Sequence, residues 1–139
     1  MALDLNSLKD AVKSLEEIVS VVEDKKQFSA LTKKQQKGLK AGVIQNFEFT
    51  YELCWKFMKR WLEINYNPSV DMVAKNELFR LAAEHLLITD VTKWFNYHKA
   101  RNRTSHIYNE DIAEEVFKVS CEFLPEAEEL LKVLEEHND

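Results

Sequence analysis

The fold of this 139-residue chain is decided by one segment, which reads Gln45-Asn46-Phe47-Glu48-Phe49-Thr50-Tyr51-Glu52-Leu53-Cys54-Trp55-Lys56-Phe57-Met58-Lys59. Its apolar residues recur every three or four positions, which is the spacing of one helix face. The segment contains neither glycine nor proline, so nothing in it interrupts a helix. The same spacing continues in both directions, from Leu39 to Leu62. We therefore predict one long helix that ends near Ile64.

Start signals upstream and downstream of this helix divide the rest of the chain into further helices. Thr32-Lys33-Lys34-Gln35 has the form of a capping box and begins the long helix. Apolar periodicity predicts a first helix from Leu5 to about Phe28. The other expected helices are a third that starts at Ser69 or Asp71 and stops by Ile88, a fourth after Thr89-Asp90, and a last one from Asn109, kinked at Pro125.

The composition supports a helical chain and a single domain spanning residues 1–139. Only two glycines and two prolines are present, too few for the tight turns of an all-β fold. Hydrophobic residues make up 45% and charged residues 31%, as in ordinary folded domains. We expect an all-α, up-and-down four-helix bundle with an additional or kinked fifth helix.

The same composition bears on location and ligands. No apolar run approaches the roughly 20 residues that span a bilayer, and the N-terminus does not have the layout of a signal peptide, so we expect a cytoplasmic protein that does not bind membranes. Cys54 and Cys121 are expected to be buried free thiols. Histidines and cysteines are not paired at ligand spacing, so we expect neither a metal nor a cofactor.

The richest chemistry lies between Trp94 and Asp111, where aromatic, cationic and imidazole side chains are concentrated. Within it, Arg101, His106 and Tyr108 form an Arg-x4-His-x-Tyr pattern. Arginine offers a fixed charge that fits phosphate, and histidine can exchange a proton near neutral pH. A continuous helix would place Arg101 and His106 about 140° apart around its axis. A break near Thr104-Ser105, or a second copy of the protein, would bring them together.

With the segment Gln45 to Lys59, this pattern resembles the HEPN-domain family. More narrowly, the chain is similar to the nucleotidyltransferase substrate-binding proteins, which are encoded beside a minimal nucleotidyltransferase and pair with it. The resemblance implies a HEPN-like bundle, a homodimer and a heterotetramer with that partner, and a nucleotide or RNA ligand. We favour a non-catalytic subunit that binds the substrate, since the chain lacks the Gly-Ser and paired-Asp signature of the transferase itself.

The resemblance also implies an alternative, a metal-independent ribonuclease toxin that the partner neutralises. In it His106 acts as general acid or base and Arg101 stabilises the charged phosphate in the transition state. Tyr108 accepts AMP from the partner. Substrate-binding residues expected around these three are Asn102, Arg103, Lys99, Tyr97, Glu48 and Glu52, with Trp94 and Tyr97 as possible stacking partners for a base.

Plainer interpretations stay open for each group. Arg101 and His106 could only form an ion-pair and hydrogen-bond network with Glu48 or Glu52. Trp94 and Phe95 are more often core residues than a base platform, and His98 is more often a hydrogen-bonded packing residue. The aromatic residues of the long helix exceed what one face can bury, which predicts a surface for a second copy. A helical dimerisation module without a ligand is the third interpretation.

Overall fold

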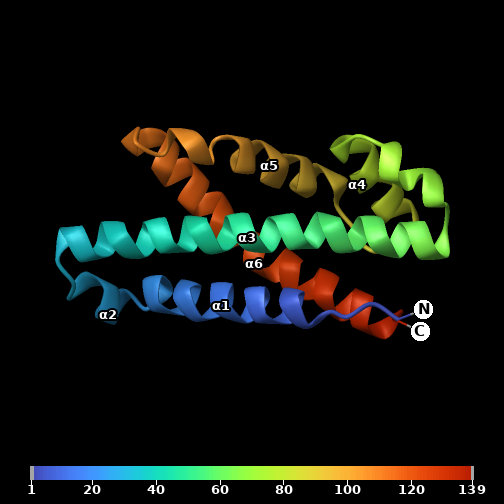
Figure 1. Cartoon of the computed structure of the whole chain (residues 1–139). Coiled ribbons are helices and arrows are strands. Elements are labelled where there is room, and N and C mark those ends of the chain that lie inside the picture. Colours follow the sequence, from blue (N-terminus) through green and yellow to red (C-terminus); the bar gives the residue numbers. More distant parts are fainter. Residues whose placement is uncertain (1, 139) are drawn as a thin grey trace.

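The computed structural model describes residues 2–138, which form six α-helices and two short 3-10 helices. The α-helices are α1 (Asn6–Glu23), α2 (Lys25–Ser29), α3 (Lys33–Asn65), α4 (Lys75–Glu84), α5 (Val91–Asn102) and α6 (Glu110–Glu136); the 3-10 helices are η1 (Pro68–Met72) and η2 (Thr104–His106). The all-α bundle predicted from the sequence is confirmed. Its fourth position is shared by two short helices, α4 and α5, which lie along the same side of α3 (Figure 1).

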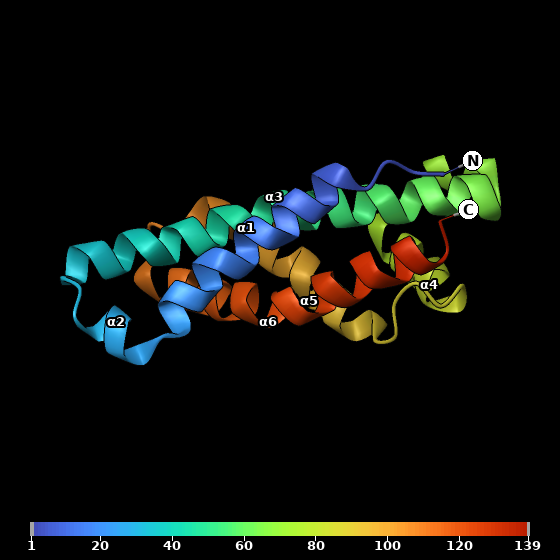
Figure 2. The same cartoon turned by 90° about the horizontal axis from the view of Figure 1, so that it is seen from below.

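The long helix α3 is the axis of the bundle, and α1 and α6 pack against it. Thr32 caps α3 as predicted: its side chain accepts from the Gln35 backbone, and Gln35 returns a bond to the Thr32 backbone. The chain runs up and down, so both termini lie at the end of the bundle remote from α2 (Figures 1 and 2). There the backbone of Leu3 and the side chain of Asn138 exchange two hydrogen bonds.

The core is built from one face of each helix. Its centre is a set of aromatic side chains from α3, α4, α5 and α6, each no more than about a twentieth exposed: Phe47, Tyr51, Phe79, Trp94, Tyr97 and Phe123. Most ring pairs among them meet edge to face, the geometry that aromatic quadrupoles favour. This cluster fixes α5 between α3 and α6.

Two predicted helix boundaries are wrong. The first helix ends at Glu23 and not at Phe28, because Asp24 has an extended backbone and caps α2, with its side chain accepting from Gln27. The third helix begins at Lys75, because Pro68 opens a 3-10 turn capped by Asn67. Pro125 lies inside an unbroken α6, which confirms that its apolar register continues past the proline.

The two glycines of α3 have different surroundings. A Cβ at Gly42 would meet Ile18 Cδ1 of α1 at 2.7 Å, whereas a Cβ at Gly38 would meet nothing within 4 Å. We expect Gly38→Ala to raise the free energy of unfolding by about 1 kcal/mol through helix propensity. Gly42→Ala should gain less, because the Ile18 side chain must move. Urea denaturation of both variants tests this, and an equal gain would contradict the close approach of α1.

Candidate functional site

Helix α5 ends one residue after Arg101, which decides between the continuous helix and the interrupted helix that the sequence left open. Helix α5 ends at Asn102, and η2 carries the chain to His106 before α6 begins. Thr104 stabilises the break: its Oγ1 donates to the Arg101 carbonyl at 2.9 Å and accepts from Arg101 Nη1 at 3.1 Å. A threonine hydroxyl that binds nearby backbone competes with the helical hydrogen bonds. The continuous-helix alternative is therefore wrong.

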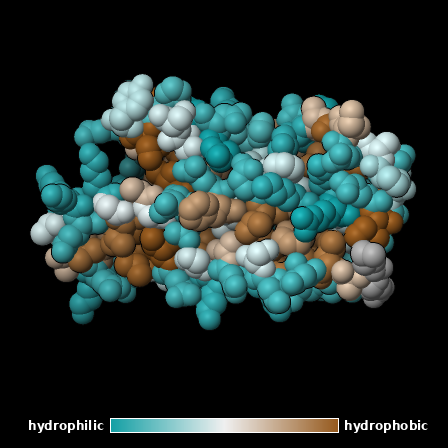
Figure 3. Space-filling model, viewed as in Figure 1, coloured by the Kyte–Doolittle hydropathy of each residue, from teal (hydrophilic) through white to brown (hydrophobic). Residues whose placement is uncertain are grey.

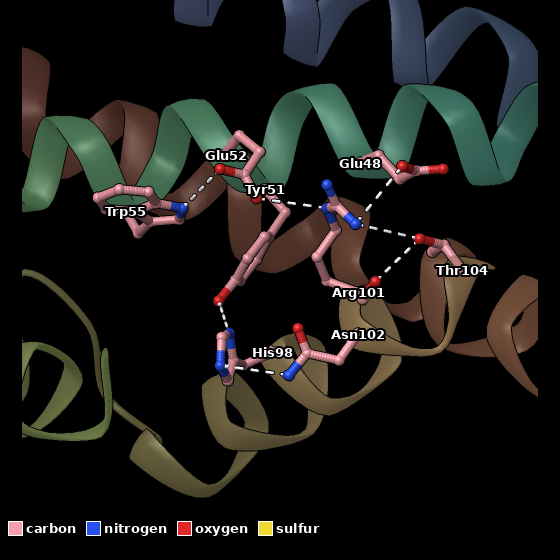
Figure 4. Close-up of polar contacts among 8 residues, drawn as sticks. All are labelled: Glu48, Tyr51, Glu52, Trp55, His98, Arg101, Asn102 and Thr104. Atoms are coloured by element: carbon pink, nitrogen blue, oxygen red, sulfur yellow. Dashed lines mark hydrogen bonds and ion pairs between the residues drawn. The ribbon is translucent and has the colours of Figure 1, made fainter. Parts of the chain in front are cut away.

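Arg101 points from α5 toward α3, where two carboxylates receive it (Figure 4). Its Nη1 lies 3.7 Å from Glu48 Oε2, and its Nε lies 3.3 Å from Glu52 Oε1. Arg101 Nε is close enough to Glu52 Oε1 for an ion pair, but its N–H group does not form a hydrogen bond with that oxygen. All three side chains are about one-third exposed. These contacts are the ion pairs of the plainer interpretation, formed by Arg101, and two negative charges face one positive charge.

A second polar chain lies beside this group, between α3 and α5. Tyr51 Oη and His98 Nδ1 are 2.7 Å apart, and His98 Nε2 lies 3.5 Å from Asn102 Nδ2 (Figure 4). Burial, with a smaller contribution from Glu52, raises the pKa of Tyr51 far above its ordinary value, so its hydroxyl stays protonated. His98 is thus a hydrogen-bonded packing residue, as the plainer interpretation predicted, and Asn102 is held through it.

The pKa of His98 is lowered, first by burial and then by the nearby positive charge of Lys75. The unfolded chain therefore takes up a proton at this histidine at higher pH than the folded chain does. We expect His98 to contribute a loss of stability as the pH falls below about 6.5, the ordinary histidine value. Urea denaturation at several pH values should show a smaller loss in His98→Gln. An identical pH profile in the two proteins would contradict this.

His106 is the last residue of η2 and Tyr108 lies on the turn between η2 and α6, and both are exposed. The Tyr108 side chain is 83% exposed, and its ring centroid is 6.1 Å from that of His106. Within residues 2–138, His106 makes no side-chain hydrogen bond or ion pair, so the network that holds Arg101 does not include it. Arg101 is packed against α3, while the other two motif residues face solvent.

The remaining predicted residues lie on a different face of α5. Tyr97, Lys99 and Arg103 line a cavity of about 710 Å³ between α5 and α6, which we call the α5–α6 groove. Tyr97 is only 4% exposed and packs edge to face on Phe123, so it offers no free face on which a base could stack. Trp94 is 1% exposed and is a core residue, as the plainer interpretation predicted. Both rings belong to the core. The structure thus separates the predicted site residues into a carboxylate-bound group facing α3 and a second group in the groove.

A second cavity, of about 350 Å³, lies between the start of α3 and the start of α6. Lys33, Lys37 and Lys40 line it together with Ile107 of the motif turn. Lys40 is paired with Glu114 at 2.9 Å, and Glu110 also lines the cavity. Positive and negative side chains are therefore nearly balanced there, which favours a solvated, internally paired surface over an anion site.

The cysteines do not contribute a reactive group. Cys54 is buried as predicted, but Cys121 is half-buried, so that part of the prediction is wrong. Burial is the main cause that raises the pKa of the Cys121 thiol to about 11. A thiol with a raised pKa is a poor nucleophile at neutral pH. Within residues 2–138 no group of three or more His, Cys, Asp or Glu side chains is placed to hold a metal ion, and no helix is long and apolar enough to cross a membrane.

Residues 3–136 match the family described as "Nucleotidyltransferase substrate binding protein like". The chain belongs to this nucleotidyltransferase substrate-binding family. The sequence prediction of the family is confirmed, since the match covers nearly every residue that forms the bundle.

Individual proteins that are similar to the chain agree with this assignment. The chain is 38% identical over 138 residues to a Haemophilus influenzae protein named "Probable ribonuclease HepT", covering 98% of this chain and 94% of that one. A solved Haemophilus influenzae structure, described as revealing the fold of a substrate binding domain of a nucleotidyltransferase, superposes with a TM-score of 0.90 at 36% identity, covering 95% of this chain and 99% of that one. A Thermus thermophilus structure shares the fold alone, with a TM-score of 0.72 at 24% identity over 91% of this chain and 98% of that one.

Some groove residues of this family member were not predicted from its sequence. Lys118 and Glu122 of α6 complete the groove opposite Lys99, and they lie in a helix that the sequence presented only as amphipathic scaffold. Their polar character is ordinary for the outer face of a helix. Only the packing of α6 against α5 turns them toward a shared cavity.

Proposed function

We propose that the chain is a non-catalytic subunit that binds a nucleotide or polynucleotide substrate for a separately encoded minimal nucleotidyltransferase. One observation favours this function over RNA cleavage. Arg101, the cation of the motif, forms ion pairs with Glu48 and Glu52, whereas Lys99 lines the open α5–α6 groove. A cation already paired with two carboxylates is a weak phosphate ligand, because the incoming anion must displace them. The family membership of the chain supports the same proposal.

The activity of the partner tests the proposal. Nucleotidyl transfer by the minimal nucleotidyltransferase encoded beside this chain should be measured alone and with increasing amounts of the folded chain. We expect the rate to rise until the two proteins are equimolar, because the substrate is then positioned beside the transferase. A rate that does not change on addition of the folded chain would contradict the proposed subunit.

Within this proposal the subunit is a homodimer that pairs with two copies of the transferase. The surface offers apolar side chains for such contacts, and Figure 3 shows them in a broken band along the middle of one face, where α3 runs. Most of the aromatic residues on which the prediction was based are not exposed, since Phe47, Tyr51 and Phe57 are buried. The exposed aromatic side chain of the long helix is instead that of Phe49, at 59%. Light scattering at micromolar concentration should find a dimer, and a monomer would contradict it.

A second candidate function is the metal-independent ribonuclease. Two observations favour it: His106 is exposed on the turn that directly follows Arg101, and the chain is 38% identical to a protein named as a probable ribonuclease. In this reaction the RNA 2′-oxygen attacks the adjacent phosphorus, the 5′-oxygen of the next nucleotide leaves, and a cyclic phosphate remains. His106 transfers a proton and Arg101, released from its carboxylates, faces the phosphate.

Tyr108 has a role only in this second candidate. Its exposed hydroxyl oxygen attacks the α-phosphorus of ATP on the transferase, pyrophosphate leaves, and an AMP group remains on the tyrosine. The attached phosphodiester adds a negative charge and bulk beside His106, which blocks access of RNA.

Cleavage of a labelled RNA in excess EDTA separates the two candidates. The substrate-binding subunit should leave the RNA intact. Cleavage that leaves a cyclic phosphate and is lost in Arg101→Ala and in His106→Ala would replace it by the ribonuclease. His137→Ala is the matched control, because this exposed histidine lies at the opposite end of the bundle from the motif turn (Figure 1).

A further inference from the structure

The α5–α6 groove has the size and lining of a ligand site. Its volume of about 710 Å³ lies within the range of roughly 300–1,000 Å³ that small-molecule sites occupy. Its floor is apolar and comes from both helices, with Ala100 on α5 and Val116 and Val119 on α6. Charged side chains surround that floor. Such a lining suits a flat apolar group that carries charge at one end.

Two ion pairs join the two helices across the groove. Lys93 Nζ lies 2.9 Å from Glu126 Oε1, and Arg103 Nη1 lies 2.6 Å from Glu115 Oε2. Helices α5 and α6 therefore run antiparallel along the groove, with one pair near each end. The separation of ten positions from Lys93 to Arg103 corresponds to a length of roughly 15 Å. The pairs also neutralise four of the charged side chains that line the groove.

The charges left over change sign along the groove. Lys99 and Lys118 lie toward the Arg103 end, and neither forms an ion pair with any residue from 2 to 138. Glu122 lies toward the Lys93 end and is likewise unpaired among those residues. The groove thus presents two cations toward Arg103 and a carboxylate about one helical turn nearer to Lys93.

Tyr97 adds a hydroxyl to the acidic part of the groove. Burial, then Glu126, then Glu122 raise the pKa of Tyr97 well above its ordinary value, so its hydroxyl stays protonated and can donate. A carboxylate acceptor beside a hydroxyl donor matches the amino group and ring nitrogen on one edge of a base such as adenine. The two lysines match a phosphate group.

We propose that the α5–α6 groove binds one nucleotide, with its phosphate against Lys99 and Lys118 and its amino-bearing base against Tyr97 and Glu122. This site deepens the proposed function and rests on it, because it names the chemistry and position of the bound substrate. A free nucleotide and one unit of an RNA strand share this chemistry. The Arg101 motif turn is not part of the site.

Calorimetric titration of the full chain with AMP, adenosine, tripolyphosphate and an adenylate oligonucleotide tests the site. We expect AMP or the oligonucleotide to bind, and the double variant Lys99→Ala/Lys118→Ala to lose about tenfold or more in affinity, as loss of charge-assisted contacts implies. Glu122→Gln should weaken AMP more than tripolyphosphate. Lys132→Ala is the matched control, an exposed lysine of α6 outside the groove, and should bind normally. Tighter binding of the oligonucleotide would identify the strand as the source.

Three results would overturn the site. The first is that none of the ligands binds to the folded chain. The second is that Lys132→Ala loses as much affinity as the Lys99→Ala/Lys118→Ala variant. The third is that tripolyphosphate binds as tightly as AMP, which would indicate a surface for polyanions only. Circular dichroism establishes that each variant is folded. Mixing the groove variants with the transferase keeps this test separate from the proposed function, because a complex that forms without nucleotide binding refutes the site alone. Nucleotide binding without a complex refutes the partnership alone.

Discussion

Phe123→Ala is expected to lower the free energy of unfolding by about 3–5 kcal/mol, the range for a fully buried phenylalanine. Phe123 is 0% exposed and belongs to α6. Its ring meets aromatic side chains from both α3 and α5, with centroid distances of 4.9 Å to Tyr97, 5.1 Å to Phe47 and 5.6 Å to Trp94. Removing it opens a cavity at the junction of three helices, which the neighbours can refill only partly.

Urea denaturation followed by circular dichroism measures this loss. Domains of this size are stable by about 5–15 kcal/mol, so the variant should unfold at much lower urea concentration. Phe49→Ala makes the same chemical change at a side chain that is 59% exposed and should stay within about 0.5 kcal/mol of the parent. Equal losses in the two variants would contradict the placement of Phe123 at the centre of the core.

Arg101→Ala is expected to lower the free energy of unfolding by about 1–2 kcal/mol, the second largest effect. The substitution removes the cation between Glu48 and Glu52, so the two carboxylates repel each other. It also removes the hydrogen bond from Arg101 Nη1 to Thr104, which stabilises the end of α5. The side chains are about one-third exposed, so solvent screens part of the repulsion and keeps the effect below that of a fully buried pair.

Arg103→Ala is the matched control for Arg101→Ala. Arg103 pairs with one exposed carboxylate, Glu115, and its removal should change stability by no more than about 1 kcal/mol. A double-mutant cycle of Arg101→Ala with Glu52→Gln should give a coupling energy of at least about 0.5 kcal/mol. If the two arginine variants lose the same stability and the cycle gives no coupling, Arg101 is not held by the α3 carboxylates.

The helices were predictable wherever a local signal defined them. The capping box at Thr32, the cap at Asp90 and the continuous register of α6 through Pro125 all depend on neighbours in the sequence, and all are confirmed. The two wrong helix boundaries lie beside a capping residue that the prediction did not use, Asp24 at the first and Asn67 at the second. Asp24 ends the first helix although no glycine or proline lies before Phe28, because its backbone is extended and its side chain caps the next helix.

The candidate site was predicted in composition but not in arrangement. The ion pairs of Arg101 with Glu48 and Glu52 match the plainer interpretation of the sequence, in which both carboxylates point inward from the long helix. The groove depends on which residues of α6 lie opposite α5, and this register is set by packing between segments some 20 residues apart. No spacing within one helix indicates that Lys99 and Lys118 line one cavity.

The most direct test of the proposed subunit is light scattering coupled to size-exclusion chromatography of this chain mixed with the minimal nucleotidyltransferase that we propose as its partner. The proposal predicts one species whose mass equals two copies of each protein, and the same species with Lys132→Ala. Two separate peaks, each with the mass of the protein run alone, would contradict the proposal that this bundle serves a nucleotidyltransferase partner.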